Sequence, residues 1–297
     1  KTAYEIPKRD WSSDVCSSDL IPMSRFRRGT ALLCICLLAA WAQFCPVVRA
    51  EHEGKLQVLL LGDSTTIGSI CRRVQPAGPH LEDVIRLLLA AEKDLPPVNV
   101  INQGRDGEFI QGLLAGNRYE RDISKLPGID YIFVRYGLND QAKRDDFANN
   151  FPKDYRELLA RLRRDFPLAA IFPTSTIPYK TPEQDAQIVG LIRKVAAEEK
   201  LPYFDLYSRY QAELSHGANM LNYRRYALDK IPEQHREWLK PFVKGNSVVV
   251  MDNQLDAHFR DLPGWFGDRH PNLAGYHVIG DETAKFLAKQ LRERAKK

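Results

Sequence analysis

Residues 56–65 read LQVLLLGDST, an aliphatic run that ends at a glycine, an aspartate and a serine. Such a run, with one polar side chain among its first six residues, is typical of a strand buried on both faces. A serine in the turn after a strand of this kind lies at the carboxyl edge of the sheet, where open α/β sheets carry their active sites. The stretch therefore predicts a central strand over 56–61 and makes Ser64 a candidate nucleophile.

Further short runs share this character, being rich in aliphatic, β-branched and aromatic residues and bounded by glycine, proline or aspartate. They cover residues 98–102, 131–136, 169–172 and 202–205. Helical stripes of apolar residues alternate with them, at 80–93, 155–166, 183–200 and 273–297. Strands that alternate with helices favour a parallel sheet covered on both faces. We therefore predict an α/β fold, a three-layer α/β/α sandwich around five parallel strands.

The first 50 residues differ in character from the rest. Residues 10–20, DWSSDVCSSDL, resemble the translation of a sequencing adapter, so residues 1–22 are expected to lie outside the folded protein. Residues 23–50 combine early arginines, an apolar run too short to span a bilayer and a small-x-small end, as a secretory signal peptide does. We therefore expect a secreted or periplasmic domain over 51–297, without a stable membrane anchor.

Within this domain, residues 206–266 have a weaker pattern and predict an insert beside the active site, with an added strand at 247–251. The formal net charge of the chain is +5, but much of the excess lies in the first 50 residues. The near-balance of the remainder argues against nucleic-acid binding. Cys71 is the one cysteine after residue 50, which excludes an internal disulfide there, and we expect it to pack as a small buried hydrophobe.

Three further motifs flank the predicted elements. Residues 102–107 read NQGRDG after the second strand, residues 137–140 read GLND after the third, and residues 268–272 read DRHPN before the last helix. Each motif also has a purely structural interpretation: a tight turn, an Asx-turn and a solvated loop, with a helix cap for the Asp-Ser pair after the first strand. Their joint occurrence at predicted strand ends is far more specific than any one of them.

Together these motifs resemble those of the SGNH (GDSL-type) hydrolases, and the resemblance spans residue 56 to about 290. It implies a flavodoxin-like parallel sheet and ester hydrolysis, with Ser64 as the nucleophile and His270 as its base. It also implies an oxyanion hole made by the backbone N–H groups of Ser64 and Gly104 and by the side-chain amide of Asn139.

One spacing departs from the family pattern. An aspartate usually stands three residues before the histidine, but here that position is Gly267 and the acid is Asp268, two residues before. Side chains at i and i+2 of an extended segment point the same way, so we predict that Asp268 orients His270. A backbone carbonyl, a water or another acid are the alternatives. A second pair, Asp256 and His258, lacks the following Pro-Asn and helix and ranks below it.

Other side chains near these motifs are less specific. Arg135, in the third strand, is expected to pair with Asp63 or Asp140, because a buried guanidinium needs a partner. Trp265 and Phe266 either stack on a sugar ring or acyl chain, or pack in the core. Four other histidines show no metal-ligand spacing, so the sequence predicts no metal and no cofactor; they are His80, His216, His235 and His277.

The predicted function is a carboxylic ester hydrolase, a serine esterase that removes short O-acyl (acetyl) groups from a small-molecule or polysaccharide substrate. Export, polar composition and the lack of an apolar substrate track favour carbohydrate. The first alternative is a lysophospholipase or thioesterase, which needs a long apolar groove that residues 206–266 are placed to form. The others are a non-catalytic glycan-binding module and an acyltransferase, in which an alcohol instead of water captures the acyl-enzyme.

Overall fold

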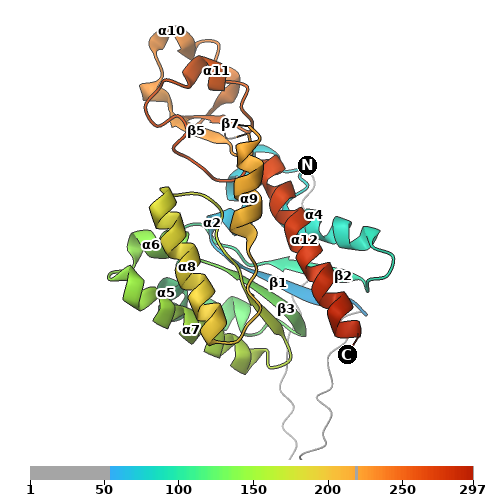
Figure 1. Cartoon of the computed structure of the whole chain (residues 1–297). Helices are drawn as coiled ribbons and strands as arrows, with labels where there is room; N and C mark the ends of the chain where they lie inside the picture. Colours follow the sequence, from blue (N-terminus) through green and yellow to red (C-terminus); the bar gives the residue numbers. More distant parts are fainter. Residues whose placement is uncertain (1–53, 218–219, 297) are drawn as a thin grey trace, which may run out of the picture. The chain divides into compact units, whose positions relative to one another are not determined.

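The computed structural model describes residues 54–217 and 220–296, so the predicted adapter and signal segments, 1–22 and 23–50, lie outside the described residues. Its centre is a parallel sheet of four strands in the order β2-β1-β3-β4 (Figure 1). The strands are β1 (Leu56–Gly62), β2 (Val98–Asn102), β3 (Ile129–Arg135) and β4 (Ala170–Pro173). The predicted first strand is therefore central, with a parallel neighbour on each side.

The predicted fifth strand, at 202–205, does not form. Only Phe204 continues the sheet, through a single parallel bridge to Thr174. Pro202 has no N–H to donate to a ladder, and the side chain of Asp205 already caps the next helix by accepting from the N–H of Ser208. The segment thus has room for one bridge before the helix begins, and the sheet has four strands instead of the five expected.

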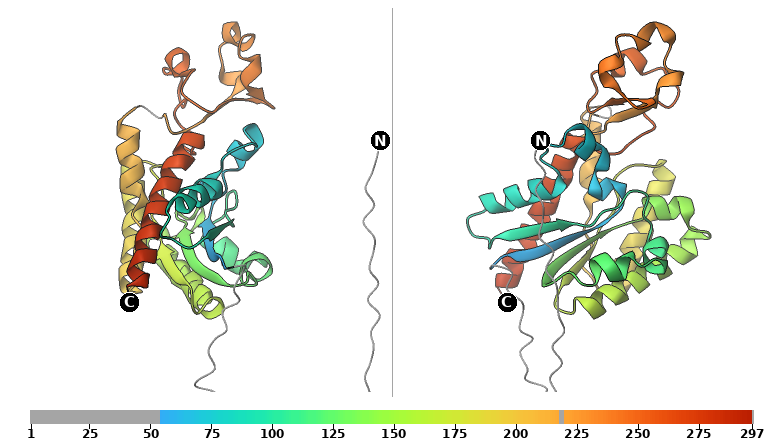
Figure 2. Two further views of the ribbon diagram at one scale, coloured as in Figure 1. Left: turned by 90° about the vertical axis from the view of Figure 1, so that its right-hand side faces the viewer. Right: turned by 180° about the vertical axis from the view of Figure 1, so that it is seen from behind.

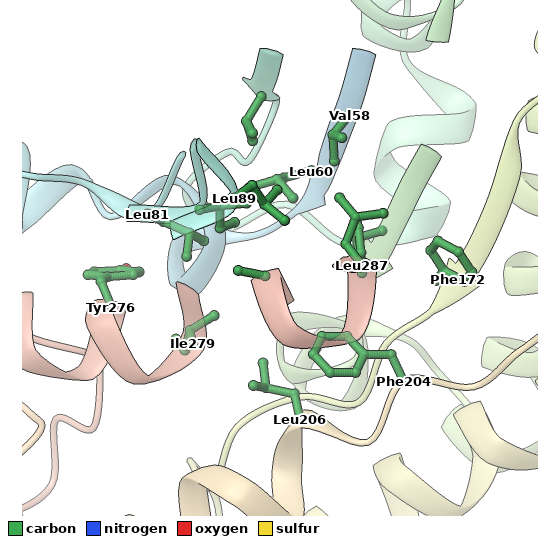
Figure 3. Close-up of a cluster of buried hydrophobic side chains, with 14 of the residues drawn as sticks. Val58, Leu60, Leu81, Leu89, Phe172, Phe204, Leu206, Tyr276, Ile279 and Leu287 are labelled. Atoms are coloured by element: carbon green, nitrogen blue, oxygen red, sulfur yellow. The ribbon is translucent and has the colours of Figure 1, made fainter. Parts of the chain in front are cut away.

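Helices cover both faces of the sheet, which confirms the predicted three layers (Figure 1). One face carries α4 (Leu81–Ala91), α9 (Leu206–Ser215) and α12 (Leu273–Ala295). The other carries α5 (Ile110–Ala115), α7 (Phe147–Asp165) and α8 (Pro182–Glu198). Because side chains alternate along a strand, β1 supplies both cores, with Val58 and Leu60 in one cluster and Leu59 and Leu61 in the other. Figure 3 shows the first cluster, where Leu60 lies among side chains of α4 and α12.

A small antiparallel sheet follows α9, in the order β5-β7-β6. Its strands are β5 (Arg224–Ala227), β6 (Val243–Lys244) and β7 (Ser247–Val250), the last of which confirms the strand predicted at 247–251. It has a hydrophobic cluster of its own that includes Val248, Phe259 and Trp265. Trp265 is 1% exposed, so it packs in this core and is not available to stack on a ligand. Figure 2 shows α10 (Glu233–Arg236) and α11 (Asp256–Phe259) beside this sheet, apart from the parallel one.

The expected insert at 206–266 thus begins with α9, which packs against α12 in the main body. The small sheet occupies the later part of that range. No helix within 54–217 and 220–296 is both long and apolar enough to cross a membrane.

Candidate active site

The turn after β1 brings Ser64 to the carboxyl edge of the sheet. Asp63 caps the short helix α2 (Ser64–Ile67), accepting from the backbone N–H of Thr65 at 2.9 Å and from its hydroxyl at 2.7 Å. The cap role therefore falls to Asp63, and Ser64 is the first helical residue, whose N–H has no acceptor within the helix. At Gly62 a Cβ would lie 2.7 Å from the carbonyl oxygen of Arg135, so the tight turn requires glycine.

Three of the predicted site residues meet in one hydrogen-bonded chain. The Oγ of Ser64 lies 2.9 Å from Nε2 of His270. On the other side of the ring, Nδ1 lies 2.6 Å from Oδ1 of Asp268, which also accepts the backbone N–H of His270 at 3.2 Å. The side chain two residues before the histidine therefore reaches the imidazole despite the shortened spacing. A proton on Nδ1, held by the carboxylate, leaves Nε2 free to accept from the serine hydroxyl.

Asp268 has a second charged neighbour that the sequence did not indicate. The Nε of Arg225, in β5, lies 3.0 Å from Oδ2 of Asp268, in an ion pair without hydrogen-bond geometry. Burial raises the pKa of the Asp268 carboxyl, but the hydrogen bond to His270 and the charges of His270 and Arg225 outweigh it. The pKa of Asp268 therefore lies below its ordinary value, which keeps the carboxylate ionised beside the imidazole.

Two tyrosines hold the imidazole of His270 from different sides. The hydroxyl of Tyr179 lies 3.0 Å from Nδ1, and its ring meets the imidazole edge-on, with centroids 5.0 Å apart. The ring of Tyr223 is stacked on the imidazole at 5.7 Å, with an interplanar angle of 18°. The thiol of Cys71, buried as expected, donates to the carbonyl oxygen of Pro271 at 3.4 Å, and burial raises its pKa to about 12. The histidine loop is thus packed on several sides.

Sequence reasoning missed Tyr179, Tyr223 and Arg225. Tyr179 follows β4, so the rule that active-site residues come after strands would have found it. Arg225 lies in β5 of the small sheet and Tyr223 directly precedes that strand, and both are far before the histidine loop in the sequence. No motif marks them, because only the packing of the small sheet against that loop brings them to the site.

Asn139, at the start of α6 (Leu138–Lys143), lines a cavity that opens beside Ser64 and His270. The carboxylate of Asp140 accepts the backbone N–H of Gly137 at 3.0 Å and that of Ile110 at 2.8 Å. These two bonds tie the start of α6 to the start of α5 and so determine where Asn139 stands. Burial raises the pKa of Asp140 to about 7, although the two backbone N–H groups oppose the shift.

Gly104, the glycine predicted for the oxyanion hole, is not among the residues that line this cavity. The N–H of Gly104 donates to the side-chain oxygen of Asn102 at 3.0 Å, and a Cβ at Gly104 would lie 2.5 Å from the backbone nitrogen of Ile67. Gly104 therefore packs beneath α2 and does not line the cavity. Gly107, at the end of the same motif, does line it and has a φ of 68°. No residue of the described part accepts the N–H of Gly107.

The prediction that Arg135 pairs with Asp63 or Asp140 is wrong. The guanidinium donates to the carbonyl oxygen of Thr65 and to the hydroxyl of Thr66, and it forms no ion pair within residues 54–217 and 220–296. Asp63 forms neither a hydrogen bond nor an ion pair with Arg135: its Oδ1 accepts from Thr65, and the two charges interact only at longer range. Arg135 thus braces the turn after β1 through neutral oxygens.

The second Asp-x-His pair lies in α11, beside the small sheet, and not at Ser64. The carboxylate of Asp256 accepts from Arg224 at 2.8 and 3.0 Å and from the indole N–H of Trp265 at 2.8 Å. The ring of His258 packs against Trp238. The guanidinium of Arg224 lies over the ring of Phe266, with its Cζ 4.9 Å from the ring centre. These side chains stabilise the small sheet.

A cavity of about 330 Å³ opens beside Ser64 and His270. Its lining is more polar than apolar, with the tyrosine rings described above and charged side chains from several elements: Arg73, Asp106, Lys180 and Arg225. Within the described ranges, no three histidine, cysteine or acidic side chains are grouped as metal ligands would be. The arrangement can therefore transfer a proton from a serine to a histidine beside a small polar cavity.

Comparisons with known proteins identify the family and the fold. The model of the GDSL-like lipase/acylhydrolase family matches residues 60–278. The search of curated proteins finds no match. The fold is similar to that of LAE5, an α/β hydrolase from the metagenome of Lake Arreo, with 17% identity, a TM-score of 0.51 and coverage of 78% of this chain and 94% of that chain.

It is also similar to the fold of Axe2, an acetylxylan esterase from Geobacillus stearothermophilus, at 17% identity, a TM-score of 0.50 and the same coverage of 78% and 94%. At this identity the two likenesses describe the fold alone. The family match extends from the middle of β1 into α12 and contains each of the motifs. The chain therefore belongs to the GDSL-like lipase/acylhydrolase family and is a carboxylic ester hydrolase.

Proposed function

We propose that this protein is a serine esterase that removes short acyl groups, acetyl above all, from carbohydrate. One observation carries the proposal: the Ser64–His270–Asp268 chain, with distances of 2.9 and 2.6 Å, borders a small cavity whose lining is more polar than apolar. A nucleophile, a base and an orienting carboxylate in hydrogen-bond contact are the parts that acyl transfer through a serine requires.

In the proposed reaction, Oγ of Ser64 attacks the ester carbonyl while Nε2 of His270 takes its proton. The new imidazolium is stabilised through Nδ1–H by the carboxylate of Asp268. When the tetrahedral intermediate collapses, the C–O bond of the ester breaks and Nε2 returns the proton to the leaving alcohol. Water, deprotonated by the same nitrogen, then attacks the acyl-enzyme; the C–Oγ bond breaks and Nε2 returns the proton to Oγ, which releases the carboxylic acid and free Ser64.

The negative charge of the tetrahedral intermediate needs donors aimed at the developing oxyanion. The backbone N–H of Ser64 and the side-chain amide of Asn139 are proposed for this role, as the family resemblance implies. For the third donor we propose Gly107 in place of Gly104. The reason is that Gly107 lines the cavity with an unoccupied N–H, whereas the N–H of Gly104 is bonded to Asn102.

The size and lining of the cavity favour a short acyl group on a sugar. Ligand cavities range from about 300 to 1,000 Å³ and are mostly apolar, and this one lies at the lower end and is mostly polar. A long acyl chain needs an apolar groove that starts at the serine. The apolar hollows elsewhere in the described part, such as the one beside Leu87 and the one beside Leu291, share no residue with this cavity.

Chain-length dependence tests the proposal. We expect residues 51–297 to hydrolyse p-nitrophenyl acetate and to lose about 100-fold in kcat/KM by the octanoate, because the longer chain finds no apolar surface. Release of p-nitrophenol is measured across the C2 to C12 esters. A higher kcat/KM for the octanoate would instead favour the lipid-directed alternative. Product formation only when an acceptor alcohol is added would favour an acyltransferase.

We also propose that the enzyme is exported and that residues 23–50 are a cleaved signal peptide. The support is the order of basic start, apolar run and small-x-small end in that stretch. Expressed from Met23 in a secreting bacterial host, the protein should appear outside the cytoplasm with an N-terminus near Glu51. N-terminal sequencing checks this, and an uncleaved protein that stays in the cytoplasm would contradict it.

A further inference from the structure

We infer that the alcohol part of the substrate carries a negative charge, so that the enzyme acts on acylated anionic saccharides bearing a carboxylate or a sulfate. This inference rests on the proposed function and concerns the same cavity. Three cationic side chains line it: Arg73 of α3 (Ser69–Val74), Lys180 in the loop after β4, and Arg225 of β5. They come from three separate parts of the chain and converge on the space beside Ser64.

Two of these cations are outside the ion pairs of the described residues, although the charge of Lys180 acts at longer range on the carboxyl of Asp185. Neither Arg73 nor Lys180 forms an ion pair with any residue of the described ranges. The contrast with the neighbouring residue is informative, because Arg72 is held by Glu82 at 2.5 Å and donates to the carbonyl oxygen of Ile67. Arg73, by contrast, remains at the cavity with all its donors available for a ligand.

Lys180 stands on an anchored piece of backbone. Its N–H donates to the buried carboxylate of Asp185 at 3.0 Å, and its carbonyl oxygen accepts from Arg269 at 3.0 Å. The ammonium group lies 5.8 Å from the ring centre of Tyr179, the tyrosine that also contacts His270. The ammonium group of Lys180 is thus held beside a tyrosine that lines the cavity.

Few acidic side chains line the cavity. Asp106 is the one carboxylate among the residues that line this cavity, and it already accepts the hydroxyl of Ser69 at 2.6 Å. Arg225 pairs with Asp268 through Nε, and its side chain remains 45% exposed. A cleft lined by an excess of one sign attracts the opposite charge and raises its local concentration. Guanidinium groups in particular match the geometry of carboxylate and sulfate oxygens.

A neutral acetylated sugar would leave these cations without a function at the mouth of the site. An anionic group on the acylated sugar, or on the sugar next to it, would meet them while the ester carbonyl stands at Ser64. The preference for anionic substrates should therefore depend on Arg73 and Lys180, while attack on the ester should not.

A matched set of substrates tests the inference: O-acetylated methyl glucosides with a hydroxymethyl, a carboxylate or a sulfate at C6. We expect kcat/KM to be about tenfold higher for at least one anionic member than for the neutral one, since two surface charges act on it. The advantage should shrink as salt is raised from about 0.02 to 0.5 M, because exposed charges are screened over the Debye length. The carboxylate and sulfate members show which anion is preferred.

The variant Arg73→Gln/Lys180→Gln should bring the three substrates to similar kcat/KM, each taken relative to that variant's own rate on neutral p-nitrophenyl acetate so that a general loss of activity cancels. The control Lys194→Gln/Lys289→Gln removes the same charge from α8 and α12, where neither lysine lines the cavity, and should keep the preference. Equal rates on charged and neutral sugars by an enzyme active on p-nitrophenyl acetate would overturn the inference and leave the esterase intact. Loss of p-nitrophenyl acetate hydrolysis by the wild type would overturn both.

Discussion

Replacing Ser64 with alanine is expected to lower kcat on p-nitrophenyl acetate by about a millionfold, close to the limit of detection. Without Oγ no acyl-enzyme forms, and His270 has no hydroxyl to deprotonate. Only transition-state stabilisation by the oxyanion donors would remain. The fold should be unaffected, because among the described residues this hydroxyl bonds only to His270. Steady-state rates, with mass spectrometry of the trapped acyl-enzyme, measure the effect.

Ser69→Ala is the matched control for this loss. Ser69 lines the same cavity, but its hydroxyl donates to Asp106 and contacts neither His270 nor Ser64. Its replacement should change kcat by no more than about threefold, as expected for a partly exposed hydrogen bond. If Ser64→Ala kept a tenth of the activity while Ser69→Ala lost it, the nucleophile would be misassigned.

Asp268→Asn should lower kcat by about 1,000- to 10,000-fold with little change in KM. The asparagine has the same shape, but its NH₂ donates towards Nδ1 of His270 and favours the tautomer with the proton on Nε2. That nitrogen can then no longer accept from Ser64, although the 2.9 Å geometry is preserved. The substitution also removes the anion that stabilises the imidazolium and leaves Arg225 without its ion pair. Rates and thermal unfolding are measured together.

Asp256→Asn provides the comparison, since it alters the other Asp-x-His pair. Its carboxylate holds Arg224 and Trp265 in the small sheet, so we expect a lower melting temperature but a kcat within a few-fold of wild type on the remaining folded protein. Near-normal activity of Asp268→Asn would show that another group, such as the Tyr179 hydroxyl 3.0 Å from the same nitrogen, orients the base. The shortened spacing would then mean that Asp268 does not act as the orienting acid of His270.

The features that depend on residues close together along the chain could be predicted from the sequence. β1 follows from an apolar run too continuous for a half-exposed strand, and the position of Ser64 follows from the Gly-Asp-Ser turn after it. The partner of Nδ1 came from the extended spacing of Asp268 and His270. The fifth strand was overpredicted, because the apolar character of 202–205 concealed the missing donor of Pro202 and the helix-capping side chain of Asp205.

By itself, the sequence determined the layered fold, the serine turn and the histidine loop, because periodicity and turn chemistry act over a few residues. The tertiary structure alone decided that Tyr223 stacks on His270, that Arg225 pairs with Asp268 and that Gly107, not Gly104, lines the cavity. These contacts join segments with no shared local pattern, such as the small sheet and the histidine loop. They arise where separate elements pack together, and packing depends on shape and burial over the whole domain and not on spacing along the chain.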